Sequence, residues 1–282
     1  MKKPRPTEKP KALAGFGGKS PEPIIKRTFL NAVRLERDLI SSYDNYPFTV
    51  PAIRHLQRLE FHPAVTFFIG ENGSGKSTLL EAIALKFGFS PEGGGRELNF
   101  STHDTHSPLH ECLRVERGFG RATDGFFLRA ESFYNVATEL EKIEKDMPAV
   151  IPHRAYGGKS LHAQSHGEAF LALLLNRLQG DGIYFFDEPE AALSPQRQLS
   201  VLTLLHRLVY HKSQLVIATH SPILLAYPNA RIYRFSDEGI AEVKYTETEH
   251  YQLTKDFLNR HERMLEMLLT VEEDDLKSKA RE

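Results

Sequence analysis

A chain of 282 residues is long enough for one large domain or two small ones, and its net charge of −1 gives no overall attraction to nucleic acid or to a membrane surface. Hydrophobic residues make up 40% of the chain and charged residues 26%, which is ordinary for a soluble globular protein. The single cysteine excludes an internal disulfide, and no apolar run approaches the roughly 20 residues of a membrane span, so we expect a cytoplasmic protein.

The first elements of the chain lead from a basic arm into a buried strand. Residues 1–23 are rich in Lys, Pro and Gly, and we expect them to be flexible. A strand is expected at 29–37, and the continuous apolar run AVTFFIG at 64–70 is typical of a buried parallel strand. Residues 76–89 show helical spacing, and residues 90–125, rich in Gly, His and Ser, indicate an irregular lid. The apolar face predicted for the helix consists of Leu79, Leu80, Ile83, Ala84 and Phe87.

Strands and helices alternate beyond residue 125. In chain order we expect a strand at 125–133, helices at 135–146 and 162–175, a strand at 182–190, a helix at 194–212, a strand at 213–222, a hairpin at 230–245 and an amphipathic closing helix at 251–270. Ser194 suits the N-cap of its helix, and Pro195 suits the first turn. The alternation predicts an α/β fold with a largely parallel sheet.

The sequence GENGSGKST at 70–78 satisfies the phosphate-loop pattern G-x-x-x-x-G-K-[ST]. A buried strand precedes it and a helix follows it, which is the context that the pattern requires. Backbone N–H groups of such a loop surround phosphate oxygens, and the helix N-terminus adds positive partial charge. Lys76 can reach the terminal phosphates, and the Ser77 hydroxyl can ligate Mg²⁺. The nucleotide-binding residues predicted here are Gly70, Glu71, Asn72, Gly73, Ser74, Gly75, Lys76, Ser77 and Thr78.

Two further strands end in groups that suit the same site. Asp187 and Glu188 end the apolar run IYFFDE, where the first carboxylate can hold Mg²⁺ opposite Ser77 and the second can polarise an attacking water. His220 ends the run LVIATH. Ligands of open α/β sheets bind at the carboxyl ends of strands, so one site can gather all these groups. Each feature alone also has a purely structural interpretation as a strand terminus.

Four motifs, GENGSGKST, SHGE, FFDEPEAALSP and IATHSP, occur in the order that resembles the ABC-type ATPases. The resemblance covers roughly residues 28–245, and the DEPEAAL form is most similar to the soluble branch related to SMC and RecF proteins. It is especially similar to compact bacterial AAA-like ATPases, some of which belong to genome-maintenance or phage-defence systems. The resemblance implies a P-loop NTPase fold with an ABC-ATPase-like sheet and a helical signature subdomain. The cofactors that it implies are ATP and Mg²⁺.

In that family the signature sequence caps a helix that faces ATP bound to a second subunit, in a head-to-tail dimer. Ser165 and Gly167 match the Ser and the second Gly of that signature, whereas Gln164 and His166 replace its Leu and first Gly. Ser165 with Glu168 also fits a capping box, so the segment would form a sound helix without any role toward ATP. The resemblance favours a homodimer, and the capping interpretation stays open beside it.

The resemblance also assigns roles to single residues. Asp187 would be the Walker B carboxylate, Glu188 the catalytic carboxylate and His220 the switch histidine. Residues 192–194 would fall at the D-loop, although the usual Asp is missing, and Glu131 is the candidate at the Q-loop position. The candidates for an aromatic side chain against the adenine are Tyr43 and Tyr46.

The domains expected from these patterns are a basic arm at 1–23, an ATPase domain at 24–250 with a helical or lid region at about 90–180, and a C-terminal helix with a charged tail at 251–282. A His- and Cys-containing run at 103–112 holds metal-capable side chains, but its spacing is not that of a zinc site, and a polar lid is the preferred interpretation.

Three functions fit these patterns. The first is an ATPase that dimerises on ATP and acts as a switch for nucleic acid or a partner effector protein. The second is the nucleotide-binding subunit of an ABC transporter, and the third is an ATP-binding module that does not hydrolyse. The form of the DEPEAALSP motif favours the first over the second, and intact Lys76, Asp187 and Glu188 favour it over the third.

Overall fold

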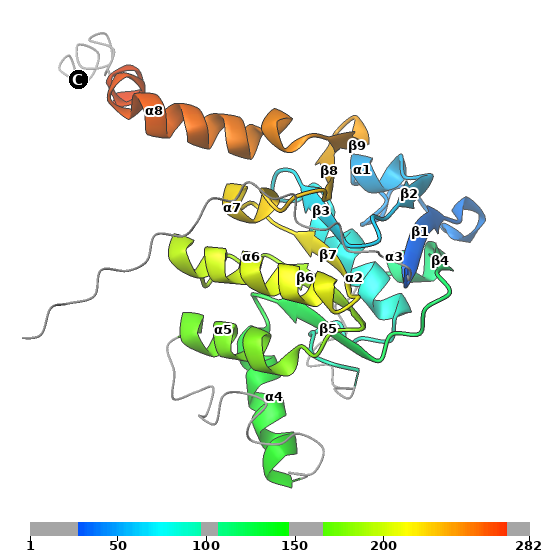
Figure 1. Ribbon diagram of the computed structural model, residues 1–282. Coiled ribbons are helices and arrows are strands. Elements are labelled where there is room, and N and C mark those ends of the chain that lie inside the picture. Colours follow the sequence, from blue (N-terminus) through cyan, green and yellow to red (C-terminus); the bar gives the residue numbers. More distant parts are fainter. Residues whose placement is uncertain (1–27, 97–106, 147–165, 270–282) are drawn as a thin grey trace, which may run out of the picture.

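The computed structural model describes residues 28–96, 107–146 and 166–269 (Figure 1). A small antiparallel sheet begins this part of the chain, with the strand order β2-β1-β4. Its strands are β1 (Leu30–Leu35), β2 (Arg58–Glu60) and β4 (Leu113–Arg117). The register pairs Val33 with Leu59 on one side and with Val115 on the other, so β1 joins chain segments that lie far apart in sequence.

A larger sheet of six strands holds the centre of the molecule, in the order β5-β6-β7-β3-β8-β9. Every neighbouring pair from β5 to β8 is parallel, and β9 closes the sheet antiparallel to β8. All residues of β3, β6 and β7 are buried, which confirms the buried parallel strands expected from their continuous apolar runs. The strands are β3 (Val65–Ile69), β5 (Asp124–Arg129), β6 (Gly182–Asp187), β7 (Gln214–Ala218), β8 (Arg231–Ser236) and β9 (Gly239–Val243).

Helices cover both faces of the large sheet. Side chains alternate along each strand, so Phe67 packs with α4, α5 and α6 on one face, whereas Phe68 packs with α2 and the small sheet on the other. The long helices are α2 (Lys76–Lys86), α4 (Phe133–Asp146), α5 (His166–Arg177), α6 (Pro195–Tyr210) and α8 (Glu249–Leu269), and the short ones are α1 (Pro51–Arg54), α3 (Leu109–Cys112), α7 (Pro222–Leu225), η1 (Arg37–Leu39) and η4 (Tyr245–Glu247).

One buried amide ties the two sheets together. Gln214 at the start of β7 is fully buried, and its Oε1 accepts hydrogen bonds from the backbone N–H groups of Phe29 and Leu30, each at 2.9 Å. Its Nε2 donates to the carbonyls of Leu30 at 2.7 Å and His62 at 3.0 Å. Because every polar group of this amide is satisfied, its burial is not penalised and the small sheet is held in register with β7.

The structure corrects the lid expected at 90–125. Residues 97–106 lie outside the described residues, but Leu109–Cys112 form α3 and Leu113–Arg117 form β4. The apolar residues of this segment belong to the core that packs against α2. Strand β4 pairs with β1 through backbone hydrogen bonds, and no local sequence pattern predicts this pairing. Among the residues of the metal-capable run that are described, Cys112 is buried with its Sγ directed at the carbonyl of Leu39, at 3.4 Å.

The amphipathic helix expected at 251–270 is present as α8, but it does not pack into the core. α8 projects away from the body (Figure 1), and none of its residues is buried. Its backbone departs from helical geometry at Arg260, where φ is −139° and ψ is 30°. Among the described residues, no helix combines the length and the apolar composition that a membrane crossing requires.

Candidate functional site

The phosphate loop leaves the end of β3 through a glycine that no other residue could replace without strain. Gly70 has φ of 144°, and a Cβ at this position would lie 2.4 Å from the carbonyl oxygen of Phe235 on β8. Only glycine allows both this conformation and this close approach. The loop then runs over the sheet edge to Gly75, the N-cap of α2, so that the first turn of α2 faces the loop interior.

Lys76 is held across the phosphate loop by the loop itself. Its side chain is buried, and Nζ donates to the carbonyls of Gly70 and Glu71, each at 2.8 Å. Burial lowers the pKa of Lys76, while Glu188 and Asp187 nearby raise it. A phosphate group placed in the loop would supply the negative charge that these two neutral carbonyls supply only in part.

Ser77 and Asp187 meet although 110 residues separate them in the chain. The Ser77 hydroxyl donates to Oδ1 of Asp187 at 2.8 Å, which joins the start of α2 to the end of β6. Burial raises the pKa of Asp187 to about 6, and the hydrogen bond from Ser77 and the charge of Arg129 oppose the shift. Neutral pH lies above this value, so the carboxylate form, which accepts the hydrogen bond from Ser77, is favoured there.

Glu188 stands on a constrained turn directly after β6. Its φ is 50°, a left-handed conformation that is uncommon for a residue with a long side chain. Its backbone N–H donates to the carbonyl of Ala218 at the end of β7, at 2.9 Å, which stabilises the turn. The turn directs the carboxylate along the sheet edge, where Oε1 lies 3.9 Å from Nε2 of His220.

His220 is contacted from three directions. Its backbone N–H donates to Oε1 of Glu190 at 2.5 Å, its Nδ1 lies 3.2 Å from Nε2 of His250, and its Nε2 faces Glu188. Burial is the first cause that lowers the pKa of His220, and the charge of Lys76 adds to it. Neither Glu190 nor His250 was predicted to belong to this site. Glu190 lies within the FFDEPEAALSP motif, whereas no signal in the sequence connects His250 with the site.

A largely buried ion pair between Arg129 and Glu81 lies beside Asp187. Arg129 at the end of β5 lies beside Asp187 in register, and its guanidinium contacts Glu81 of α2 at 2.5 Å and the carbonyl of Pro91 at 2.9 Å. The same guanidinium pairs with Glu131, the candidate at the Q-loop position, whose side chain is 70% exposed. Glu131 therefore lies at the edge of the site, where its charge raises the pKa of Asp187 slightly.

The two tyrosine candidates for the adenine lie in different environments. The Tyr46 hydroxyl is 2.5 Å from Oγ1 of Thr78, at the end of the phosphate loop, and its ring is exposed. Tyr43 instead packs edge-on against Phe48 and beneath the guanidinium of Arg54. Of the two, only Tyr46 contacts a residue of the phosphate loop.

The signature segment is described only from its second half. Ser165 lies outside the described residues, and α5 begins at His166. A Cβ on Gly167 would lie 2.6 Å from the carbonyl of Ala192 and 2.4 Å from the guanidinium of Arg197, so only glycine permits this approach. Glu168 also pairs with Arg197, at 3.4 Å. Gly167 in the first turn of α5 therefore lies in close contact with Ala192, in the segment predicted as the D-loop.

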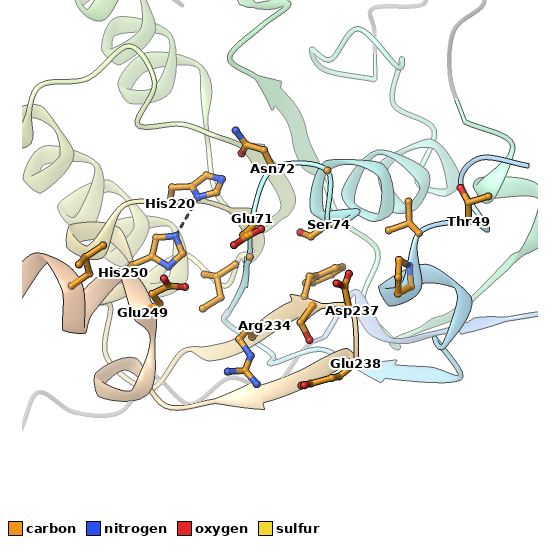
Figure 2. Close-up of a pocket in the computed structure, with 18 of the residues that line it drawn as sticks. Thr49, Glu71, Asn72, Ser74, His220, Arg234, Asp237, Glu238, Glu249 and His250 are labelled. Atoms are coloured by element: carbon orange, nitrogen blue, oxygen red, sulfur yellow. Dashed lines mark hydrogen bonds between the residues drawn. The ribbon is translucent and has the colours of Figure 1, made fainter. Parts of the chain in front are cut away.

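A cavity of about 1030 Å³ lies between the phosphate loop, the β8–β9 turn and α8. Figure 2 shows His220 and His250 on one side of it, joined by their hydrogen bond, and Asp237 and Glu238 of the turn on the other. Glu71, Asn72 and Ser74 border it from the phosphate loop. The cavity lies next to His220 rather than between Ser77 and Asp187, neither of which lines it.

The chemistry of these residues fits a magnesium–nucleotide complex. Mg²⁺ is normally held by one or two protein oxygens together with waters and phosphate oxygens, and Ser77 with Asp187 supplies such a pair. In the part of the chain that the structure describes, no group of three or more His, Cys, Asp or Glu side chains could enclose a metal by itself. With Ser77 and Asp187 as ligands, the other positions around such a cation would fall to waters and phosphate oxygens.

Two protein-family models match the chain. Residues 46–149, which contain the phosphate loop, match a model described as "AAA domain". Residues 169–226 match a second model, described as "AAA domain, putative AbiEii toxin, Type IV TA system", which contains Asp187, Glu188 and His220. No curated protein matches the chain. The first match therefore contains β3 and the phosphate loop, and the second contains β6 and β7 with the residues that follow them.

Solved structures of low sequence identity are also similar to the chain. The SMC head domain from Thermotoga maritima is 15% identical, with 77% of this chain and 99% of that one covered and a TM-score of 0.39. An ATP-binding cassette of an ABC transporter in its ADP conformation is 17% identical, with 76% and 91% covered and a TM-score of 0.40.

Proposed function

We propose that the chain is an ABC/AAA-like P-loop ATPase, which binds ATP with Mg²⁺, hydrolyses it and acts as a switch in a head-to-tail dimer; matches to two AAA-domain models support the ATPase assignment. One observation carries the proposal. The carboxyl ends of β3, β6 and β7 bring Ser77 to 2.8 Å from Asp187 and Glu188 to 3.9 Å from His220, so that a cation-binding pair and a base with its partner share one sheet edge.

Each group then has a distinct task. Lys76 would exchange its two loop carbonyls for phosphate oxygens, and Ser77 with Asp187 would hold Mg²⁺, which neutralises charge on the phosphates when it is bound. Glu188 would accept a hydrogen bond from the attacking water and orient it, because the constrained turn directs its carboxylate along the sheet edge. His220 would donate from Nε2 to the terminal phosphate.

The dimer is proposed from the surface around the start of α5. Gly167 packs directly on Ala192, and Glu168 pairs with Arg197, so the start of α5 contacts both the predicted D-loop and α6. A helix N-terminus attracts anions, and Ser165 would add a hydroxyl donor there. We propose that this surface completes the ATP site of a second copy of the chain.

The process that the switch serves is proposed to be of the phage-defence or genome-maintenance type, with nucleic acid or an effector protein as the partner. The family model that matches residues 169–226 is described for an AbiEii toxin of a type IV TA system, which favours defence over transport. Cells that express the chain should then form fewer phage plaques than cells that express the Glu188→Gln variant. Equal plaque counts would contradict this role but not ATP hydrolysis.

The decisive experiment combines hydrolysis with molecular size. Glu188→Gln should lower the rate of ATP hydrolysis about 100- to 10,000-fold, the range expected when a positioned base is removed, while ATP binding persists. With ATP and Mg²⁺ this variant should accumulate as a dimer in size-exclusion chromatography with light scattering. A variant that binds ATP but stays monomeric would overturn the dimer, and a variant that hydrolyses at the normal rate would overturn the role of Glu188.

Two matched variants make the result specific. Ser165→Arg, added to Glu188→Gln, should abolish the dimer while each monomer still binds ATP, because the charge and bulk of Arg would stand at the interface. Glu242→Gln makes the same chemical change on the exposed strand β9 and should leave hydrolysis and size unchanged. Loss of ATP binding by Ser165→Arg would instead indicate that the residue only stabilises its own helix.

A further inference from the structure

The contact between His220 and His250 joins the phosphate-loop edge to α8. His250 lies in the first turn of α8, and its Nε2 is 3.2 Å from Nδ1 of His220 (Figure 2). The outer nitrogens, Nε2 of His220 and Nδ1 of His250, are buried and have no hydrogen-bond partner among the described residues. Among the described residues, the one hydrogen bond that these two rings make is therefore the one between Nδ1 of His220 and Nε2 of His250.

Electrostatics selects which ring donates. Burial lowers the pKa of both histidines, so both are neutral at physiological pH and each carries one N–H. The groups that act on the pair are Lys76, Glu188, Glu190 and Glu249. If Nδ1 of His220 donated, the lone pair of its Nε2 would face the Glu188 carboxylate at 3.9 Å, which is repulsive. If Nε2 of His250 donates, His220 keeps its proton on Nε2 and directs an N–H at Glu188.

We propose that His250 is a positioning residue, which donates from Nε2 to Nδ1 of His220 and thereby keeps the Nε2–H of His220 directed toward Glu188 and the terminal phosphate of bound ATP. The inference rests on the proposed function for the role of His220 in hydrolysis. It adds a residue from α8, outside the four sequence motifs, to the machinery. Because His250 belongs to the first turn of α8, hydrolysis then depends on where that turn lies.

The orientation of the rings also depends on Glu190. Its Oε1 accepts the backbone N–H of His220, which anchors the main chain and leaves only the ring of His220 free to rotate. The hydrogen bond from His250 removes that remaining freedom. A single ring orientation is what a donor to a phosphate requires, since a neutral imidazole turned over would present a lone pair to an anion.

The tautomer can be read without any nucleotide. In ¹⁵N NMR spectra of the nucleotide-free full chain, with His220→Ala for assignment, the Nε2 of His220 should give a protonated signal and its Nδ1 an unprotonated, hydrogen-bonded one. In His250→Phe the ring of His220 should show a mixture of tautomers. A wild-type His220 protonated on Nδ1 would overturn the proposal whatever the chain does with ATP.

Hydrolysis tests the consequence. His250→Phe should lower kcat about 10-fold, the lower end of the loss expected when the partner that orients a reactive side chain is removed, with KM nearly unchanged. His250→Gln restores an N–H donor close to the original Nε2 and should return kcat to within about 3-fold of the wild type. If Gln is as poor as Phe while both variants are folded, His250 only fills space and the proposal fails.

The control lies one helical turn further along the same face of α8. Thr254 borders the same cavity, and Thr254→Ala should leave kcat and the His220 spectrum unchanged. His220→Ala tests the role of His220 in hydrolysis separately from its orientation by His250. If it hydrolyses ATP at the wild-type rate, the proposed role of His220 fails, whereas the NMR result still decides whether His250 orients the ring.

Discussion

Helices α2 and α8 differ in burial in a way that their sequences do not indicate. The spacing of α2 predicts one apolar face, yet Leu79 to Ala84 are all buried, including Glu81, because α2 is enclosed by the large sheet, the small sheet and α3. The spacing of α8 also predicts one apolar face, yet none of its residues is buried. Periodicity therefore predicts that a segment is helical, but the neighbours that the fold supplies decide what is covered.

The two helices also contribute to the site in different ways. The buried helix α2 carries Lys76 and Ser77 and holds them in fixed positions at the sheet edge. The exposed helix α8 reaches the site through its first turn, where His250 contacts His220. A rigid element suits the binding of phosphates, whereas an element with few contacts can change its position at low cost in free energy.

The largest expected effect is on stability. Leu80→Ala in α2 should lower the free energy of unfolding by about 2–5 kcal/mol, because it removes a fully buried side chain and leaves a cavity. Leu258→Ala in α8 removes the same atoms from a side chain that is 69% exposed and should change it by less than about 0.5 kcal/mol. Urea unfolding measures both. Equal losses would show that α8 is covered in solution.

The next expected effect is on the affinity for ATP. Lys76→Ala should weaken ATP binding about 100-fold, or about 2.7 kcal/mol, because a buried ammonium that reaches the phosphates is lost. Lys255→Ala, at an exposed position of α8 over the ring of Tyr251, should leave the affinity unchanged. Titration calorimetry with ATP and Mg²⁺ compares the two. Normal binding by Lys76→Ala would place the phosphates away from α2.

Burial at the sheet edge also has a cost, which the pH dependence of stability reveals. The pKa of Asp187 is raised from 3.8 to about 6, so between these values the folded chain binds more protons than the unfolded one. The free energy of unfolding should therefore fall as pH rises from about 4 to about 6, and this contribution stays constant above that.

Asp187→Asn should remove this dependence and raise the free energy of unfolding at pH 7 by up to about 3 kcal/mol. Urea unfolding in EDTA from pH 4.5 to 7.5 measures it, with Asp256→Asn on exposed α8 as the control that should change nothing. A variant no more stable than the wild type at pH 7 would show that Asp187 is not strained by burial.

The smallest effect concerns the outer half of α8. A chain that ends at Arg260, where the helix geometry is already interrupted, should unfold with a free energy within about 0.5 kcal/mol of the full chain, since no residue of α8 is buried. Circular dichroism would show a smaller helical signal with an unchanged midpoint in urea. A loss of more than about 1 kcal/mol would mean that this half of α8 packs on another surface.

Much of the fold follows from local patterns. The runs at 64–70, 182–190 and 213–222 become the central strands β3, β6 and β7, and Ser194 caps α6 by accepting from the N–H of Arg197. These features depend on residues that are neighbours in the chain, so alternation and spacing reveal them. Strand β4 was missed because its hydrogen-bond partner, β1, lies almost 80 residues earlier, and its own residues alternate only partly between buried and exposed.

The candidate site divides in the same way. The positions of the phosphate loop, Asp187 and His220 after neighbouring strands were predicted from the sequence, because each motif marks the carboxyl end of a strand and parallel strands end at one edge. Arg129 with Glu81, and Glu190 with His220, were not, since each contact joins elements whose relative position no motif records.

Spacing along the chain is enough to predict most of the strands and helices and the chemical groups that end the central strands. It does not predict that His250, one of 13 histidines, lies against His220, that α2 is enclosed or that α8 has no buried residue. These outcomes depend on the surfaces that distant segments present to each other when the sheet assembles. The phosphate loop is therefore recognisable in the letters GENGSGKST, whereas its connection to α8 is visible only in the fold.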